Sequence, residues 1–231
     1  MSVSAIIQTR TTDLQASIDF YTTLNFQLLS SASPTLLTDG KIILEINPDR
    51  YARAGIQLYR ADWEPVVDQL KDRYAISPLE KGYLLSDPSG CWIYLMNGTS
   101  GVSFDLSGTA FGVLGNCAGL TLETTEIARS VALWEGLGFS QTMGGIEQGW
   151  ITYTDPHGTV VSLMKPLVCP HAFYNPSLSY FNGKNNLSVI EKIRELDIPI
   201  TEEIAHFNQK GIVDNIIIRD PGGLGFFIFS D

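Results

Sequence analysis

Histidine and cysteine, the residues most typical of zinc sites and of nucleophilic or acid–base catalysis, are few in this sequence and mostly far apart. Only Cys169 and His171 stand close together, and no second pair accompanies them, so the spacing does not predict a structural zinc site. We expect the histidines to lie in a turn, a linker and a loop at the surface. The histidines are His157, His171 and His206, and the cysteines are Cys91, Cys117 and Cys169.

No catalytic nucleophile can be recognised from spacing. Ser17 and Ser130 fall on predicted helices, and the sequence has no Gly-x-Ser-x-Gly motif. The glycine-rich residues 222–225 lie between two predicted strands, whereas a phosphate-binding loop leads into a helix. Glu45 and Glu123 could act as a carboxylate pair in acid–base chemistry, but they lie in different halves of the chain and nothing in the sequence brings them together.

The overall composition predicts a globular protein without a polyanionic partner. The net charge is −10, and no lysine or arginine cluster exists, so we expect neither nucleic acid nor membrane as a partner. Apolar residues make up 44%, which suits a packed core. No apolar run approaches the roughly 20 residues of a membrane span, and residues 1–4 do not predict a signal peptide. Because the cysteines lack framework spacing, we expect a cytoplasmic protein.

One segment of the chain occurs twice. Residues 13–26 read Asp-Leu-Gln-Ala-Ser-Ile-Asp-Phe-Tyr-Thr-Thr-Leu-Asn-Phe, and residues 126–139 read Glu-Ile-Ala-Arg-Ser-Val-Ala-Leu-Trp-Glu-Gly-Leu-Gly-Phe. In each copy, apolar residues at i, i+4 and i+7 predict an amphipathic helix between strands. The expected N-caps are Thr12 or Asp13 for the first helix and Thr124 or Thr125 for the second.

A second kind of unit also occurs twice, with a strand, a helix and a hairpin whose turn reads Asp-Pro-x-Gly. This turn supplies a cap and a position of positive φ, as a hairpin requires. The chain therefore reads as four units in the order A-B-A′-B′, each a strand, a helix and three strands. The turns begin at Asp87 and Asp220, with a third copy at Asp155 and a shortened one at Asp39. The second B unit has its expected helix at residues 187–196, with Leu187, Ile190 and Ile193 on one side.

This pattern resembles the βαβββ module of the vicinal-oxygen-chelate superfamily, which includes glyoxalases, bleomycin-resistance proteins and extradiol dioxygenases. The resemblance covers nearly the whole chain outside its linkers. It implies an α+β fold in which four modules pair into two U-shaped mixed sheets, with the helices outside and a ligand cleft inside. Another α+β repeat, such as a ferredoxin-like pair, would show a similar alternation and remains an alternative. The expected domains are residues 1–97 (modules 1–48 and 55–97) and 113–231 (modules 113–166 and 177–231), joined by a linker at 98–112.

The resemblance also implies where a metal would be held. Enzymes of the superfamily bind a divalent ion through His or Gln on the first strand of a module and Glu on the last. Only Glu45 provides such a carboxylate, and nearby Gln8 and Gln57 add at most one amide each. We therefore expect neither a metal nor another cofactor. Counting from the motifs gives Ile6, Ile56 and Gly119 as first-strand positions and Glu45, Tyr94, Ser162 and Phe227 as last-strand positions.

The remaining candidates are mostly aromatic, and a cleft simply filled by their rings is the alternative to a ligand site. A carboxylate beside two rings suits a cationic or aromatic small molecule. We therefore expect a metal-free small-molecule binder similar to bleomycin-resistance proteins. The alternatives are a superfamily enzyme (a lyase, isomerase or dioxygenase) with an atypical site and a non-catalytic interaction protein; neither catalytic residues nor an oligomeric state can be predicted. The candidate ligand-binding residues are Glu45, Trp92 and Tyr94 in the first half and Phe227 and Phe229 in the second.

Overall fold

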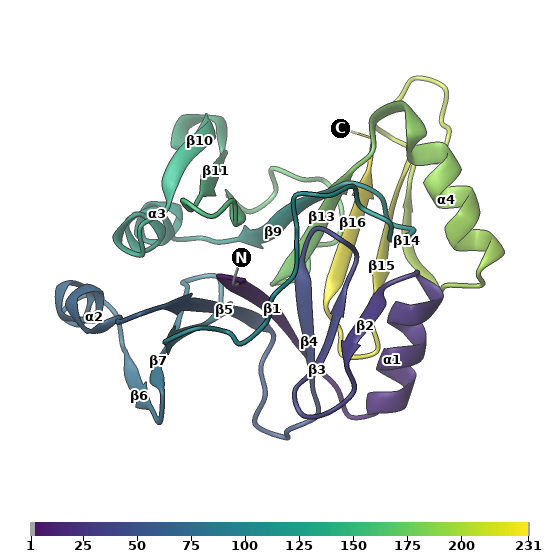
Figure 1. Cartoon of the computed structure of the whole chain (residues 1–231). Coiled ribbons are helices and arrows are strands. Elements are labelled where there is room, and N and C mark those ends of the chain that lie inside the picture. Colours follow the sequence, from purple (N-terminus) through teal and green to yellow (C-terminus); the bar gives the residue numbers. More distant parts are fainter. Residues whose placement is uncertain (1–2, 231) are drawn as a thin grey trace.

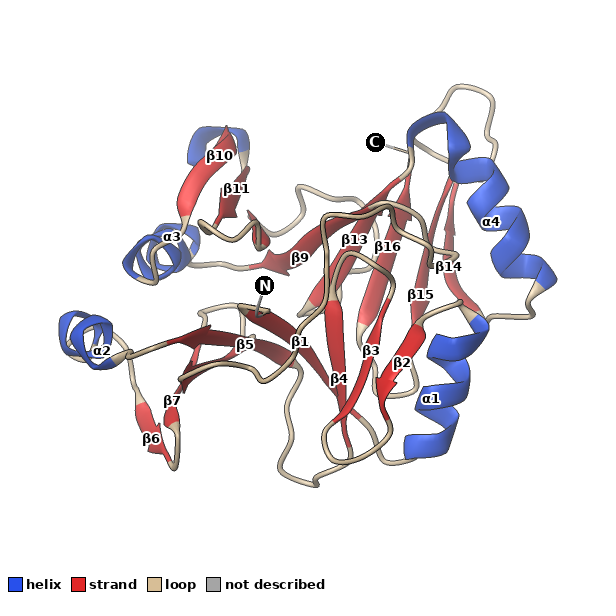
Figure 2. Cartoon of the chain, in the orientation of Figure 1, coloured by secondary structure: helices blue, strands red, loops and turns tan. Residues whose placement is uncertain are grey.

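The chain folds into four consecutive βαβββ modules that pair into two eight-stranded mixed sheets (Figures 1 and 2). This computed structural model describes residues 3–230, so residues 1, 2 and 231 of the expected domains lie outside the described residues. The first sheet has the order β2-β3-β4-β1-β5-β8-β7-β6, and the second repeats it as β10-β11-β12-β9-β13-β16-β15-β14. The α+β fold expected from the repeat is confirmed. None of the described helices is long and apolar enough to cross a membrane.

The elements follow the same order in every module. The first contains β1 (Ala5–Arg10), α1 (Leu14–Thr23), β2 (Gln27–Ser30), β3 (Thr35–Thr38) and β4 (Ile43–Asn47). The second contains β5 (Gly55–Arg60), α2 (Glu64–Leu70), β6 (Ser77–Leu79), β7 (Gly82–Ser86) and β8 (Trp92–Asn97). The third contains β9 (Cys117–Glu123), α3 (Ile127–Gly136), β10 (Ser140–Gly145), η1 (Ile146–Gln148), β11 (Trp150–Thr154) and β12 (Val160–Met164). The fourth contains β13 (Ser177–Phe181), η2 (Gly183–Asn185), α4 (Asn186–Glu195), β14 (Ile200–Ile204), β15 (Asn215–Arg219) and β16 (Gly225–Phe229).

The helix ends agree only in part with the sequence pattern. Asp13 caps α1, because its carboxylate accepts a hydrogen bond from the Ala16 amide at 3.0 Å. The expected threonine cap of α3 is wrong, since the N-cap is Glu126 and its side chain makes no capping bond. On α4, Leu187 is 45% exposed and Asn186 takes the buried position, where its amide bonds the carbonyls of two neighbouring segments. A polar residue thus replaces the apolar one that the helical period predicted.

One continuous hydrophobic core includes both sheets and all four helices. Figure 1 shows α1 and α4 at one end of the molecule and α2 and α3 at the other. Each sheet also carries a small second cluster, which lies on the opposite face because side chains alternate along a strand. We call these the first and second cleft faces. Segments between modules cover part of each: residues 102–106 on the first sheet and residues 173–174 on the second.

The two halves of the chain are joined by aspartates from the hairpin turns. Asp220 accepts hydrogen bonds from the Tyr21 hydroxyl of α1 at 2.8 Å and from Thr9 at 2.7 Å. In the corresponding place, Asp87 accepts from the Trp134 indole of α3 at 3.0 Å and from Ser130 at 3.1 Å. Both carboxylates are almost wholly buried. The turn motif therefore does more than close a hairpin, because its aspartate binds a helix of the other half.

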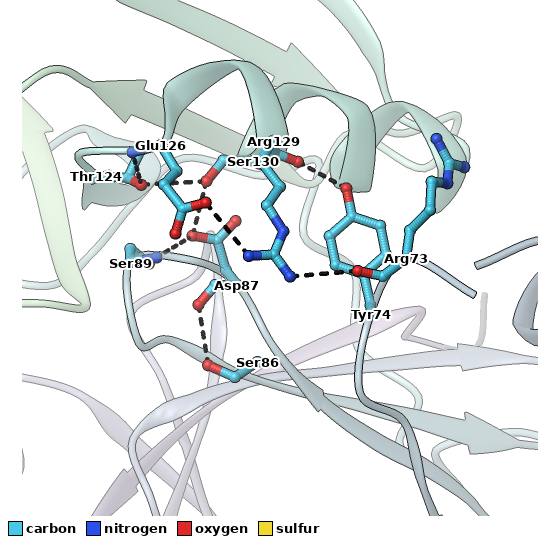
Figure 3. A network of polar contacts seen from close by, with 9 residues as sticks. All are labelled: Arg73, Tyr74, Ser86, Asp87, Ser89, Thr124, Glu126, Arg129 and Ser130. Carbon is cyan, nitrogen blue, oxygen red and sulfur yellow. Dashed lines mark hydrogen bonds and ion pairs between the residues drawn. The ribbon is translucent and has the colours of Figure 1, made fainter. Parts of the chain in front are cut away.

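Figure 3 shows the surroundings of the second of these contacts. Asp87 lies between Ser89 of its own turn, whose amide donates to it at 2.7 Å, and Ser130 on α3. Beside it, the Tyr74 hydroxyl donates to the Arg129 carbonyl at 2.8 Å, and the Arg129 guanidinium returns a bond to the Arg73 carbonyl at 3.2 Å. These bonds attach the end of the α2 region to α3.

Candidate ligand-binding clefts

The centre of the first cleft face is polar. In the parallel pair β1–β4, Gln8 lies opposite Glu45, and in the parallel pair β5–β8, Gln57 lies opposite Tyr94. These four residues come from the central strands β4, β1, β5 and β8, which adjoin in that order. The fold thus brings together two amides, one carboxylate and one phenol that are distant in sequence.

One register prediction was wrong. Counting from the motifs placed Ile56 on the cleft face, but Ile56 is fully buried in the main core. Neighbouring residues of a strand point to opposite faces, so Gln57 takes the cleft position instead. Ile6 does lie on the cleft face, in the small cluster, two residues before Gln8.

A hydrogen-bond network connects the polar side chains of the cleft. The Gln57 amide nitrogen donates to the Gln8 carbonyl at 2.9 Å and to Glu45 at 2.8 Å. The Gln8 nitrogen in turn donates to the Arg53 carbonyl at 2.8 Å and to the Tyr94 hydroxyl at 3.1 Å. Because Tyr94 accepts this bond, its own hydroxyl hydrogen is left to donate to another partner.

Two further side chains complete the network. The Tyr59 hydroxyl donates to the Gln57 carbonyl at 2.6 Å, and the Asn47 amide donates to the Gln8 carbonyl at 3.3 Å. Gln8 therefore uses both of its hydrogens and accepts two bonds, which fixes the orientation of its amide.

Burial dominates the electrostatics of this cluster. Desolvation raises the pKa of Glu45, and the hydrogen bond from Gln57 opposes this effect. Desolvation, followed by the charge of Glu45, raises the pKa of Tyr59 to about 12. Desolvation also raises the pKa of Tyr94. Both phenols therefore keep their protons at neutral pH.

An open pocket of about 570 Å³ adjoins the network. Gln8, Asn47 and Tyr94 belong to both, and the exposed Tyr51 forms part of the pocket wall. Of the residues predicted from the sequence, Tyr94 lines this pocket. Glu45 reaches it only through Gln57 and Gln8, and Trp92 lies on the same strand two residues from Tyr94, outside the pocket lining.

The second cleft face has a different chemistry. At its centre the hydroxyls of Thr121 and Ser179 are 2.7 Å apart. Phe227 and Phe229 pack against the His171 ring, with centroids 5.2 Å and 5.1 Å from it. Both phenylalanines are buried, being at most 9% exposed. The predicted residues Phe227 and Phe229 are therefore covered by the segment that carries His171.

Neither cleft has side chains suited to a divalent metal. Among residues 3–230, no three His, Cys, Asp or Glu side chains converge on one point. In the first cleft the network around Gln8 holds one carboxylate, Glu45, while Asp49 lies in the pocket wall and accepts a hydrogen bond from the Tyr51 amide. The Gln8 carbonyl oxygen already accepts two hydrogen bonds. In the second cleft the corresponding residues are hydroxyl-bearing and aromatic. These groups do not match the nitrogen and carboxylate oxygen donors that such a metal requires.

Sequence reasoning undervalued two residues of the network, Gln8 and Gln57. It treated them only as substitutes for metal ligands. The available signal was a glutamine in the middle of each strand, directly after an isoleucine: Ile-Ile-Gln-Thr in β1 and Gly-Ile-Gln-Leu in β5. A buried amide needs hydrogen-bond partners, so two such residues on adjacent strands predict a shared network.

Comparison with known proteins finds a likeness in structure alone. No protein-family model matches the sequence, and no curated protein matches it. The structure is similar to that of a catechol 2,3-dioxygenase, with a TM-score of 0.58 and 13% identity over 97% of this chain and 86% of the other. A 2,3-dioxygenase from Pseudomonas sp. KL28 gives a TM-score of 0.58 and 15% identity over 98% and 91%. Homoprotocatechuate 2,3-dioxygenase from Arthrobacter globiformis gives 0.56 and 14% over 98% and 79%.

Proposed function

Because the chain has the vicinal-oxygen-chelate fold in the two-sheet arrangement of the extradiol dioxygenases, we propose that it binds a small organic molecule in the first cleft without a metal. The observation that carries the proposal is the network around Gln8 and Gln57, which presents the Tyr94 hydroxyl to a pocket of about 570 Å³. A pocket of this size suits a metabolite-sized ligand. The donor set gives no reason to place a metal there.

The chemistry of the pocket suggests the kind of ligand. Tyr94 offers a hydrogen to an acceptor group, and Glu45 receives within the described residues one hydrogen bond, from Gln57. Tyr51 and Tyr94 supply ring faces. A cationic aromatic molecule that also carries an oxygen acceptor would use the phenol and the rings directly, and the negative charge of Glu45 would act on it at longer range, through Gln57 and Gln8.

The proposal is tested by a thermal-shift screen of such molecules followed by calorimetric titration. A ligand at 100 times its Kd adds about 2.7 kcal/mol to the unfolding free energy, which is easily detected. Glu45→Gln should weaken a cationic ligand by about 1 kcal/mol, because the negative charge behind Gln57 and Gln8 is lost. Addition of a chelator should leave affinity unchanged.

A matched control lies in the second sheet, where Ser162 pairs with Thr121 as Glu45 pairs with Gln8. Ser162→Ala should leave affinity unchanged. Equal weakening by Ser162→Ala and Glu45→Gln, or loss of binding in chelator, would contradict the proposal.

The alternative of a dioxygenase with an atypical site is favoured by the structural likeness to catechol dioxygenases. It is distinguished by oxygen uptake with catechol and an added divalent metal. On our proposal the chain consumes no oxygen above the rate of a sample without protein. Uptake that depends on both the metal and Glu45 would replace the binder with the enzyme.

A further inference from the structure

The two halves of the chain correspond, but one of their four turn contacts differs from the others. Asp87 and Asp220 bind a helix of the opposite half, and Asp39 accepts a hydrogen bond from the Tyr180 hydroxyl of the opposite half at 2.9 Å. The fourth turn aspartate, Asp155, accepts hydrogen bonds only from backbone amides of its own turn among the described residues.

The difference arises at the residue that faces this turn. Two residues mark matching places in the two modules, because each pairs with the first residue of its module's last strand. Ser177 pairs with Gly225 of β16, and Gly55 pairs with Trp92 of β8. Three positions further along, the fourth module has Tyr180 and the second has Leu58. Leucine has no hydroxyl to reach the turn carboxylate. A cavity of about 240 Å³ lies there, between Leu58 and Trp63 of one half and Phe139 and Asp155 of the other.

At the corresponding junction the chain itself fills this space. The Phe111 amide donates to the Asp39 carbonyl, and the Val113 amide donates to the carbonyl of Leu24, the C-cap of α1, each at 2.9 Å. The Asn25 side-chain amide donates to the Phe111 carbonyl at 2.7 Å. The occupant is therefore a short peptide segment with donors, an acceptor and apolar side chains.

Arg60 takes the place of this asparagine beside the cavity. Leu137 is the C-cap of α3, as Leu24 is of α1, so Gly138 corresponds to Asn25. A Cβ atom at Gly138 would lie 3.1 Å from the Arg60 guanidinium, which also donates to the Leu137 carbonyl at 3.3 Å. The same guanidinium stacks on the Trp63 ring, 4.2 Å from its centroid. Arg60 thus presents further N–H donors where the asparagine amide binds a carbonyl.

We propose that this cavity binds a free apolar α-amino acid. The Arg60 guanidinium would receive the carboxylate, where the Phe111 carbonyl lies at the other junction. The Asp155 carboxylate would receive the ammonium group, and the walls formed by Leu58, Trp63 and Phe139 would receive the side chain. A cavity of 240 Å³ is below the range for drug-sized ligands, which suits a molecule as small as leucine. This inference is independent of the first cleft.

The test is calorimetric titration of the whole chain with L-leucine, compared with two analogues. Leucine should bind with a Kd below about 1 mM. Arg60→Gln should weaken leucine about tenfold or more but should leave leucinamide, which lacks the carboxylate, unaffected. Asp155→Asn, which keeps an oxygen for the turn amides, should weaken leucine but not 4-methylpentanoate, which lacks the ammonium group.

Matched variants separate this site from the rest of the molecule. Arg219 also stacks on an aromatic ring, that of Tyr174, so Arg219→Gln controls for loss of an exposed arginine and should not alter leucine binding. Leu58→Tyr should fill the cavity as Tyr180 does at the other junction and abolish binding. If that variant does not fold, Arg60→Gln and Asp155→Asn still decide the question.

Three results would overturn the inference. The first is that neither leucine, valine nor phenylalanine binds at concentrations of about 10 mM. The second is that Arg60→Gln binds leucine as tightly as the unaltered chain does, and the third is that Tyr94→Phe no longer binds leucine. The last result would move the amino acid to the first cleft. Leucine binding that survives in Tyr94→Phe would separate this site from the proposed function.

Discussion

Glu45 is a partly buried carboxylate on β4, the last strand of the first module, and it accepts a hydrogen bond from the Gln57 amide at 2.8 Å. Its burial raises its pKa, so the folded chain binds this proton more tightly than the unfolded chain does.

This shift has a definite sign in the stability of the protein. A raised carboxyl pKa means that stability from Glu45 is greatest when it is protonated, and that it is lost as pH rises from the unfolded pKa through the folded pKa. The difference between the unfolding free energy of Glu45→Gln and that of the unaltered chain should therefore increase with pH over that window. Above the window this difference should stay constant. Urea denaturation of both proteins between about pH 4 and pH 7 measures the difference.

Glu191→Gln is the control, because Glu191 is exposed on α4. Its unfolding free energy should differ from that of the unaltered chain by no more than about 0.5 kcal/mol, as for an exposed side chain. Parallel profiles for Glu45→Gln and the unaltered chain would show that burial of Glu45 has no energetic consequence.

At the same scale, sequence identified some site residues and not others. Glu45 and Tyr94 were predicted because the turn motifs fix the start of each last strand. The sequence placed Ile56 on the cleft face instead of its neighbour Gln57, because no motif marks the start of β5. An error of one residue exchanges the two faces of a strand. Trp92 was predicted to line the ligand site, but it lies on β8 outside the pocket lining, because the sequence could not show that the pocket lies toward Asn47 and Tyr51.

At the scale of elements, the structure gives the Asp-Pro-x-Gly turns a second role. The hairpins were predictable from the turn residues, whereas the helices that their aspartates bind were not. Asp87 and Trp134 are 47 residues apart, and no local pattern relates them. The repeat could have suggested the pairing, because Tyr21 and Trp134 hold the same position in α1 and α3.

Trp134→Phe tests this role while keeping an aromatic ring in the core. The substitution removes the indole N–H from the buried Asp87 carboxylate, which keeps its bonds from Ser130 and Ser89. We expect a loss of about 1–3 kcal/mol in unfolding free energy, as for a buried acceptor that loses one donor. Urea denaturation gives this value directly.

Tyr21→Phe should have a similar cost at the other junction, because Asp220 then loses a buried hydroxyl donor. Tyr51→Phe is the control, because Tyr51 is 69% exposed. Removal of its hydroxyl should change the unfolding free energy by no more than about 0.5 kcal/mol. Equal effects of all three variants would mean that the turn aspartates contribute nothing specific.

At the scale of the whole molecule, the sequence predicted two domains joined at residues 98–112, and the structure gives each half its own sheet. The halves nevertheless share one core and the buried contacts of Asp39, Asp87 and Asp220. We therefore expect residues 3–230 to unfold as one cooperative unit.

Hydrogen exchange in mild urea tests this expectation. Amides in β1 and β16 should exchange with the same unfolding free energy, and Trp134→Phe should lower both by the same amount. A lower value in one half alone would show two independently unfolding domains at the predicted boundary.

The contact between Tyr21 and Asp220 also bears on the order of events during synthesis. The two residues are 199 positions apart, so the hydroxyl on α1 and that of Thr9 await a carboxylate that is synthesised much later. Domains usually form from the N-terminus onward as the ribosome extends the chain. Here the first sheet can form early, but the helix face that carries Tyr21 stays open to other chains until the hairpin that carries Asp220 has been synthesised. The period of greatest risk of aggregation for this protein is therefore the interval in which the second half is being translated.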